Sequence, residues 1–454
     1  MPKVKIGQQL TLKIKRLGIN GEGIGYFQRL ITFVPGALPG ETVNARVEKA
    51  TEKFAEASIV RIVKKSPDRV VPPCPVYDRC GGCQLQHLNY QSQLDFKKDL
   101  LKQALAKFKP AGWESWELRN TLGMDDPWHY RNKAQFQLRQ QGDTIEAGLY
   151  ETNSHTLVPL KDCIVQQPVT TTVMNATVAL LNKYRLPVYD ERTNSGILRT
   201  VMVRMGIKTG EVQVVLITRT PKLPQKNALI REMIEQMPEV VSIMQNVQPK
   251  KTSLVMGDET LHLWGKESIE EEIQGVQFDL SPRAFFQLNP QQTEILYAEA
   301  RKALDPQKEE VLIDAYCGVG TIGLSMAQQV KEIRGMDTIP QAIDDAHRNA
   351  ARLGVTNAHY EVGTAESLLP KWFKEGVEPD SLIVDPPRTG LDHQLLQAIV
   401  KQPPRKMVYI SCNVSTLARD LVKLTKVYGV HYLQSVDMFP QTARCEVVVK
   451  LTRK

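Results

Sequence analysis

The sequence predicts a multi-domain protein of the α+β and α/β classes, with a small amino-terminal β-barrel, a central mostly β domain and a carboxyl-terminal Rossmann-like domain. Short runs of alternating polar and apolar residues, separated by glycine and proline, fill residues 1–62. Hairpin patterns dominate the middle of the chain. From about residue 275 onward strand and helix patterns alternate, which is typical of a doubly wound parallel sheet. We therefore expect domains at 1–62, 63–270 and 271–454.

The composition is that of an ordinary globular protein. The chain has 454 residues, of which 42% are hydrophobic and 24% charged, so it is long enough for several domains with cores of their own. The start lacks the apolar core of a signal peptide, and no apolar run approaches the length of a membrane span. Seven unevenly spaced cysteines argue against a disulfide framework and favour reduced thiols. We expect a cytoplasmic monomer without a membrane partner.

Most of the positive charge lies in the predicted barrel and the few residues after it. Residues 1–66 hold 12 Lys and Arg and 5 Glu, so they carry +7 of the net charge of +8. A basic module beside a nearly neutral body is typical of proteins that hold nucleic acid through its phosphates. Short strands at this density fit an OB-like barrel, which is a nucleic-acid-binding fold. A solvated charged surface would explain the charge about equally well.

The central region is predicted to begin with a cysteine-rich loop. Cys74, Cys80 and Cys83 lie within ten residues, and Gly81-Gly82 lets the loop wrap closely round a metal centre. Three thiols need a fourth ligand, for which Cys163 is the candidate. A three-plus-one arrangement fits a four-iron cluster at least as well as zinc, and a loop without metal is the third alternative.

The rest of the central region is predicted to be mostly β. Hairpin turns are expected at Gly142-Asp143 and at Thr209-Gly210, because each separates two runs of strand-forming residues. Helical patterns are expected at about 90–108 and 170–184.

A glycine-rich turn follows the first strand pattern of the alternating region. Gly318-Val319-Gly320 comes shortly after the apolar run Val311-Leu312-Ile313, so the backbone there can approach a bound nucleoside closely. Dinucleotide-binding enzymes share such a turn. Asp314 before the glycines favours S-adenosylmethionine over a pyrophosphate, and Asp337, 23 residues later, is placed to accept the ribose hydroxyls.

Two further motifs follow predicted strands of the same sheet. Two prolines after Asp385 fix the backbone and direct the carboxylate into the pocket. Arg388 holds the fourth position of this Asp-Pro-Pro-Arg motif, where methyltransferases that act on amino groups usually carry an aromatic residue. Cys412 comes soon after the apolar run Met407-Val408-Tyr409, which places a thiol at the carboxyl edge of the sheet.

A thiol beside a methyl-donor pocket suggests methylation of a carbon that needs covalent activation, such as uracil C5. A thiolate that adds to C6 turns the ring into an enolate whose C5 attacks the methyl sulfonium, and a base must then remove the C5 proton. We predict that Cys412 is the nucleophile, with its pKa lowered by Arg388, and that Glu446 is the base. Taken singly, each is explained as a buried thiol or a surface carboxylate. Cys445 points to the opposite face of its strand.

Taken together, these motifs resemble the RNA (uracil-5-)-methyltransferase family, in particular its bacterial branch with an amino-terminal TRAM domain and an iron–sulfur cluster that modifies 23S ribosomal RNA. The resemblance covers nearly the whole chain, including Ser-Pro-Arg-Ala-Phe-Phe-Gln-Leu-Asn at 281–289. It implies catalytic roles for Cys412, Glu446, Asp385 and Arg388. It implies a cofactor site formed by Gln287, Tyr316, Gly318, Gly320, Thr321, Asp337 and Asp385. It also implies a [4Fe-4S] cluster on Cys74, Cys80, Cys83 and Cys163 rather than zinc, and packing of the helix near 90–125 on the catalytic domain.

The resulting hypothesis is transfer of a methyl group from S-adenosylmethionine to C5 of a uridine in RNA. Large-subunit 23S ribosomal RNA is favoured, because relatives that act on transfer RNA generally lack both the barrel and the cysteine cluster. Two alternatives stay open. One is a methyltransferase for transfer RNA uridine C5 or RNA cytosine C5, and the other is an RNA-binding module with an iron–sulfur cluster and no enzymatic activity.

Overall fold

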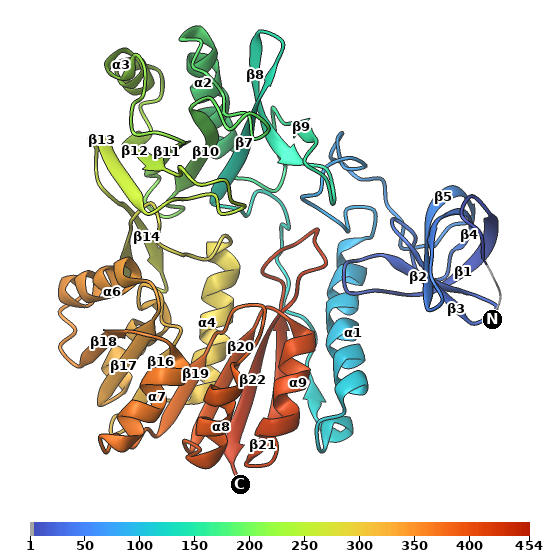
Figure 1. Cartoon of the computed structure of the whole chain (residues 1–454). Coiled ribbons are helices and arrows are strands. Elements are labelled where there is room, and N and C mark those ends of the chain that lie inside the picture. Colours follow the sequence, from blue (N-terminus) through green and yellow to red (C-terminus); the bar gives the residue numbers. More distant parts are fainter. Residues whose placement is uncertain (1–3) are drawn as a thin grey trace.

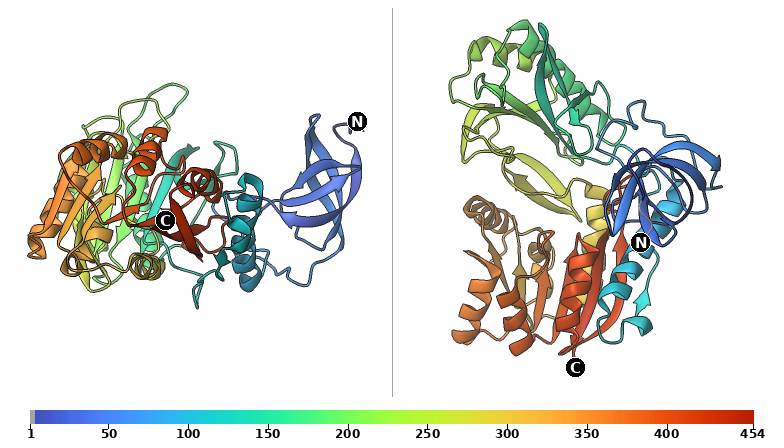
Figure 2. Two further views of the ribbon diagram at one scale, coloured as in Figure 1. Left: turned by 90° about the horizontal axis from the view of Figure 1, so that it is seen from below. Right: turned by 45° about the vertical axis from the view of Figure 1, so that its right-hand side comes forward.

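A computed structural model describes residues 4–454 and shows three parts that follow one another along the chain (Figure 1). The amino-terminal barrel lies beside helix α1 (Tyr90–Phe108), and Figure 2 shows it at the edge of the molecule in two further views. The central sheet and the carboxyl-terminal sheet lie one above the other in Figure 1. Residues 1–3 of the predicted barrel domain fall outside the described residues, and the predicted boundaries at 62 and 270 stay predictions.

The predicted amino-terminal barrel is confirmed: five strands close in the order β1-β2-β3-β5-β4. Alternate residues of the first strand, Leu10, Leu12 and Ile14, are buried, as the period of two requires. The turn between the first two strands contains Gly21 at φ +85°, a conformation that favours glycine. The strands are β1 (Gln9–Leu17), β2 (Gly23–Phe27), β3 (Leu30–Val34), β4 (Thr42–Ala50) and β5 (Phe54–Lys64).

The central part is a seven-stranded sheet in the order β13-β12-β11-β10-β7-β8-β9, and both predicted hairpins are present in it. Its strands are β7 (Lys133–Gln141), β8 (Thr144–Tyr150), β9 (Leu157–Pro159), β10 (Leu198–Met205), β11 (Val212–Thr218), β12 (Val240–Val247) and β13 (Glu259–Gly265). Helices α2 (Pro168–Lys183) and α3 (Lys226–Gln236) pack on it, and the hairpin β14 (Ile269–Ile273) with β15 (Val276–Leu280) leads to the last part.

The segment after the cysteine-rich loop packs on the carboxyl-terminal part. Asn89 caps α1 by accepting a hydrogen bond from Ser92 N at 2.9 Å, and the apolar side of α1 shares a core with α9 (Val414–Leu424) through Leu101 and Leu417. After a short 3₁₀ turn (Trp113–Ser115), strand β6 (Glu117–Leu118) pairs with β21 (Tyr428–Val436). The segment therefore completes the carboxyl-terminal sheet although it precedes the central sheet in sequence.

The carboxyl-terminal part is an eight-stranded sheet in the order β18-β17-β16-β19-β20-β22-β21-β6. Its further strands are β16 (Val311–Ala315), β17 (Glu332–Asp337), β18 (Ala358–Val362), β19 (Ser381–Val384), β20 (Lys406–Ser411) and the antiparallel β22 (Glu446–Arg453). The strand order reverses between β16 and β19, and ligands of such sheets bind at the carboxyl ends of the strands beside this point. The predicted doubly wound sheet is present, but its continuous parallel part runs only from β18 to β20, because β22 runs antiparallel to both of its neighbours.

Helices cover both faces of this sheet (Figure 1). One core lies under α1, α7 (Ala365–Lys374), α8 (His393–Lys401) and α9, and the other lies under α4 (Pro290–Leu304), α5 (Thr321–Leu324) and α6 (Pro340–Arg352). A 3₁₀ turn (Ala327–Gln329) precedes β17. Among residues 4–454, no helix combines the length and the apolar character that a membrane span requires.

Candidate active site

The turn between β16 and α5 has a backbone shape that few sequences can adopt. Tyr316, Gly318 and Gly320 all have positive φ, at +70°, +56° and +84°. The turn is tied to the neighbouring strand β17 by two hydrogen bonds: Cys317 N donates to Met336 O at 2.9 Å, and Gly318 N donates to Asp337 Oδ2 at 3.2 Å. The structure thus brings the predicted cofactor turn and its predicted carboxylate together.

Carboxylates gather at the carboxyl ends of neighbouring strands. Asp314 is buried in β16, and its Oδ2 accepts a hydrogen bond from Gly323 N at 2.9 Å. Burial, together with the charges of Asp385 and Asp337, raises the pKa of Asp314 to about 7. Burial also raises the pKa of Asp385, at the end of β19, to about 7. Gln287 lies in the 281–289 segment, which is held by Arg204 through Ser281 O and Ala284 O.

Asn413 joins the two motif loops that carry Arg388 and Cys412. Its side chain caps α9 by accepting from Ser415 N at 3.0 Å, and its Nδ2 donates to Arg388 O at 2.9 Å. Thr416 Oγ1 donates to the same carbonyl at 3.3 Å. Arg388 and Cys412 therefore line one cavity. Its lining residues are Ile19, Asn20, Leu100, Arg388, Cys412, Asn413, Val414, Ala443, Arg444 and Cys445.

Strand register places Glu446 beside Cys412. Strands β20 and β22 run antiparallel with Ser411 paired to Val447 as their last pair, and Cys412 and Glu446 are the residues directly next to that pair. Glu446 is 5% exposed, and burial and the charge of Asp385 raise its pKa well above its ordinary value, against the opposing effect of Arg388. The Cys445 thiol donates to Lys97 O at 3.6 Å and is turned toward α1.

The expected fall in the pKa of Cys412 is not found. Burial and the charges of Glu446 and Asp385 raise the pKa of Cys412 to about 12, while Arg388 acts in the predicted direction and lowers it. The prediction considered the cation alone, and the two carboxylates that oppose it come from strands whose positions the sequence pattern did not specify.

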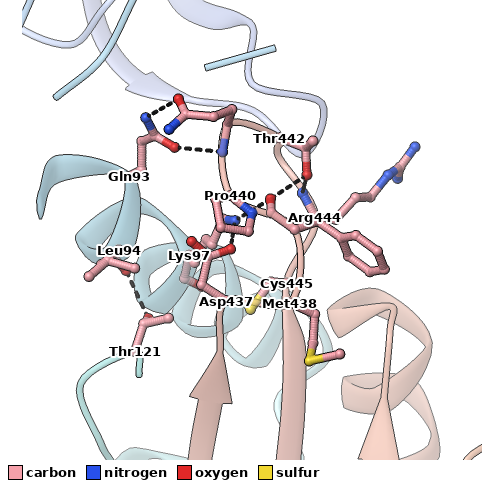
Figure 3. Close-up of polar contacts among 12 residues, drawn as sticks. Gln93, Leu94, Lys97, Thr121, Asp437, Met438, Pro440, Thr442, Arg444 and Cys445 are labelled. Atoms are coloured by element: carbon pink, nitrogen blue, oxygen red, sulfur yellow. Dashed lines mark hydrogen bonds and ion pairs between the residues drawn. The ribbon is translucent and has the colours of Figure 1, made fainter. Parts of the chain in front are cut away.

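The loop that leads into Glu446 is held from outside the sheet by α1 (Figure 3). Lys97 forms an ion pair with Asp437 and donates to Phe439 O at 3.0 Å, and both charged side chains are fully buried. Gln93 donates to Gln441 Oε1 at 3.0 Å and accepts from Gln441 N at 3.0 Å. The sequence analysis missed these contacts. The signal was the position of Gln93 and Lys97 on the same helical face as Phe96, Leu100 and Leu101.

The four predicted metal-binding cysteines line one pocket of the central part, and all four are free thiols. Within residues 4–454, however, no group of three or more Cys, His, Asp or Glu is close enough to hold a metal ion. Two polar atoms of the same pocket, Arg131 Nε and Gln166 Oε1, are buried without a hydrogen-bond partner among the described residues. Thiols are the donor type that iron–sulfur clusters use, and Arg131 Nε is a donor to which an anion could pair, whereas Gln166 Oε1 is an acceptor and could not pair with an anion.

Comparisons with family profiles and with known proteins agree on one family. A profile described as tRNA (Uracil-5-)-methyltransferase matches residues 89–454, and a TRAM domain profile matches residues 3–60. The chain is 72% identical over 451 residues to an uncharacterized RNA methyltransferase of Enterococcus faecalis, covering 99% of each protein. It is 55% identical over 452 residues to one of Streptococcus pneumoniae, again covering 99% of each.

One solved structure matches nearly the whole chain. It is the tRNA (uracil-54, C5)-methyltransferase of Pyrococcus abyssi in complex with S-adenosyl-L-homocysteine, with a TM-score of 0.77 and 28% identity over 98% of this chain and 100% of that one. The match extends through the barrel, the central sheet and the catalytic sheet. The chain therefore belongs to the tRNA (uracil-5-)-methyltransferase family and is an S-adenosylmethionine-dependent RNA methyltransferase with an amino-terminal TRAM domain.

Proposed function

We propose that the protein methylates C5 of a specific uridine in 23S ribosomal RNA through a covalent adduct between Cys412 and uracil C6. The observation that carries this proposal is the register of β20 and β22, whose last pair, Ser411 and Val447, directly adjoins Cys412 and Glu446. Cys412 lines a cavity together with Arg388. A nucleophile and a base held side by side at the carboxyl edge of the sheet are what addition to C6 and proton removal from C5 require.

The methyl donor would lie in the turn after β16. Asp337, which accepts a hydrogen bond from Gly318 N, would accept the ribose hydroxyls, and Tyr316, Gly318, Gly320 and Thr321 would line the donor site from the turn. Gln287 would contribute from the 281–289 segment. The acidic surroundings of Asp314 and Asp385 favour a cationic sulfonium over a phosphate.

The reaction proceeds by addition and elimination. The Cys412 thiolate adds to C6, and the electron pair of the C5–C6 double bond becomes an enolate. C5 then attacks the methyl group, and S-adenosylhomocysteine leaves. Glu446 takes the C5 proton, the double bond re-forms and the thiolate is expelled from C6. Burial and two carboxylates raise the pKa of Cys412, and Arg388 opposes them and favours the thiolate.

The cysteine pocket would hold a [4Fe-4S] cluster on Cys74, Cys80, Cys83 and Cys163. A bound cluster would link two segments that lie about 80 residues apart in sequence. Arg131, whose Nε has no partner in the pocket, would then donate to the anionic cluster.

Transfer RNA is the second candidate substrate. The Pyrococcus abyssi enzyme acts on uracil 54 of tRNA and aligns with 98% of this chain, so the barrel does not by itself distinguish the two substrates. This alignment weakens the expectation that enzymes acting on tRNA lack the barrel, on which the preference for 23S ribosomal RNA partly rested. The spacing of the cysteines still resembles the ribosomal branch.

The deciding experiment maps 5-methyluridine in 23S ribosomal RNA and tRNA from cells with and without the gene, and repeats the reaction on defined transcripts. Loss of a methyl group from one 23S site supports the first candidate, and loss only from tRNA supports the second. A transcript with the target uridine replaced by cytidine should not be methylated, and its methylation would favour the cytosine alternative. No methyl transfer to any transcript would refute the proposal.

A further inference from the structure

A turn of the barrel forms part of the cavity that contains Cys412. Ile19 and Asn20, in the β1–β2 turn at 18–22, line the same cavity as Arg388 and Cys412. These barrel residues are separated from the catalytic cysteine by almost 400 positions in sequence. The amino-terminal module therefore reaches the catalytic centre itself, in addition to lying at the edge of the molecule (Figure 2).

The turn has a defined shape. Gly18 N donates to Glu22 O at 2.7 Å, Gly21 N donates to Gly18 O at 3.0 Å, and Asn20 N donates to Glu22 Oε2 at 2.9 Å. These bonds close the turn and leave the side chains of Ile19 and Asn20 on its exposed side.

The turn is also packed against residues 437–445, the loop that leads into Glu446, which we call the catalytic loop. A Cβ atom placed on Gly21 would lie 3.0 Å from Leu85 Cδ2 and 3.4 Å from Ala443 Cβ, so the glycine backbone is in contact with that loop. Leu17, just before the turn, belongs to the same buried core as Leu85 and Ala443. Gln103 of α1 donates to Leu17 O at 3.4 Å. The position of Ile19 relative to Cys412 is thus set by packing on both sides of the turn.

The surface that results has the chemistry of a nucleotide contact. Ile19 is apolar and 43% exposed at the cavity, where an aliphatic side chain can pack on a base or ribose. Asn20 offers an amide donor and acceptor, and Arg388 and Arg444, which line the same cavity, offer cations. A nucleotide that is flipped out of its base stack exposes both its apolar ring face and its polar edge, and this combination of apolar, amide and guanidinium groups can contact both.

We propose that Ile19 and Asn20 are specificity-determining residues that contact the nucleotide entering the Cys412 cavity. Ile19 packs against its base or ribose, and Asn20 hydrogen-bonds to its polar edge. The barrel would then help to position the uridine at the thiol, so it would affect the rate of methyl transfer as well as RNA affinity. This inference rests on the proposed uridine methylation and deepens it.

The test compares Ile19→Ser and Asn20→Ala with Val63→Ser in the full-length protein. Val63 is 53% exposed on β5 of the same barrel and does not line the cavity, so it is a matched control. Single-turnover methylation is measured at saturating RNA and S-adenosylmethionine, together with RNA affinity, cofactor affinity and thermal unfolding.

We expect the two turn variants to slow methyl transfer by about tenfold or more, the scale of one lost base contact, while cofactor affinity and the melting temperature stay unchanged. The control should keep the wild-type rate. Weaker RNA binding with an unchanged rate of methyl transfer at saturating RNA would overturn the inference, because the turn would then contribute to RNA affinity alone. A control as slow as the turn variants would also overturn it. If wild-type protein methylates no uridine, the proposed function fails instead, so the two failures are distinguishable.

Discussion

Removal of the buried cation at position 97 tests whether α1 holds the catalytic loop in place. Lys97 is bonded to Asp437 and to Phe439 O, and Asp437 Oδ2 accepts a second hydrogen bond from Tyr90 OH at 2.8 Å. Lys97→Met keeps the length of the side chain and removes its charge. The Asp437 carboxylate would then stay buried with the Tyr90 hydroxyl as its remaining side-chain partner.

The magnitude follows from complete burial of the pair. An exposed ion pair is worth about 0–1 kcal/mol, whereas loss of one partner from a buried pair costs about 3–5 kcal/mol because an unpaired charge remains inside. Both side chains here are 0% exposed, so the larger range applies. The double variant Lys97→Met with Asp437→Asn removes both charges, and we expect it to be more stable than Lys97→Met alone.

Amide hydrogen exchange measures the loss of stability in the loop itself, which is needed because the parts of a multi-domain chain need not unfold together. In Lys97→Met, amides of residues 437–445 should exchange about a hundredfold faster or more, and methyl transfer should slow while S-adenosylmethionine affinity is kept. Lys102→Met, on the exposed side of α1, is the control. Exchange within about threefold of wild type in Lys97→Met, or a double variant whose loss equals the sum of both single losses, would refute the reasoning.

Three further predictions concern the site. Cys412→Ala should abolish methyl transfer and keep cofactor binding, and Glu446→Gln should accumulate a denaturation-resistant protein–RNA adduct on gels; near-native turnover of Cys412→Ala would contradict the mechanism. Anaerobically purified protein should hold about four irons, and Cys163→Ser should release them and lower the thermal stability, whereas stoichiometric zinc without iron would reject the assignment. Burial raises the pKa of Asp314 to about 7, so the unfolded chain loses this proton at lower pH than the folded protein, and the free energy of unfolding should fall as the pH rises from about 4 to 7. Asp314→Asn should show a smaller fall in the free energy of unfolding over the same range, measured by unfolding at several pH values. Equal pH profiles for the two proteins would contradict this.

The barrel has a closer relation to catalysis than its charge suggests. Leu17 and Leu38 of the barrel lie in the buried core that also holds Leu85 and Ala443. Deletion of residues 1–62 would therefore expose apolar side chains beside the catalytic loop as well as remove basic residues. Point substitutions on the β1–β2 turn separate these two effects, and deletion does not.

The cysteine loop is also adjacent to the catalytic loop. Gln84 N and Leu85 N, directly after Cys83, donate to Gln441 O at 2.9 and 3.0 Å. The Cys163→Ser variant should consequently slow methyl transfer in addition to losing iron, because the segment that holds Gln441 would be less ordered. Methylation kinetics of the iron-depleted protein measure this directly, and a wild-type rate would show that the two loops are independent.

Much of the fold followed from patterns between near neighbours in sequence. Alternation in Gln9–Leu17 predicted a strand, and the glycines at 318 and 320 predicted a turn, in which the structure gives both of them positive φ. The motifs around Asp385 and Cys412 could be placed at strand ends for the same reason, since a strand and the turn after it are specified by a few consecutive residues. Whether these residues have the predicted catalytic roles is left to the experiments above.

Contacts between distant segments could not be inferred in this way. Nothing near Lys97 indicates that its partner is Asp437, and nothing near Ile19 indicates a cavity shared with Cys412, because neither pair is related by a fixed local spacing. The raised pKa of Cys412 has the same origin: it depends on carboxylates that reach the thiol from β19 and β22. Secondary structure is determined largely by residues a few positions apart, whereas burial, charge and the shape of a cavity depend on how the completed elements pack together.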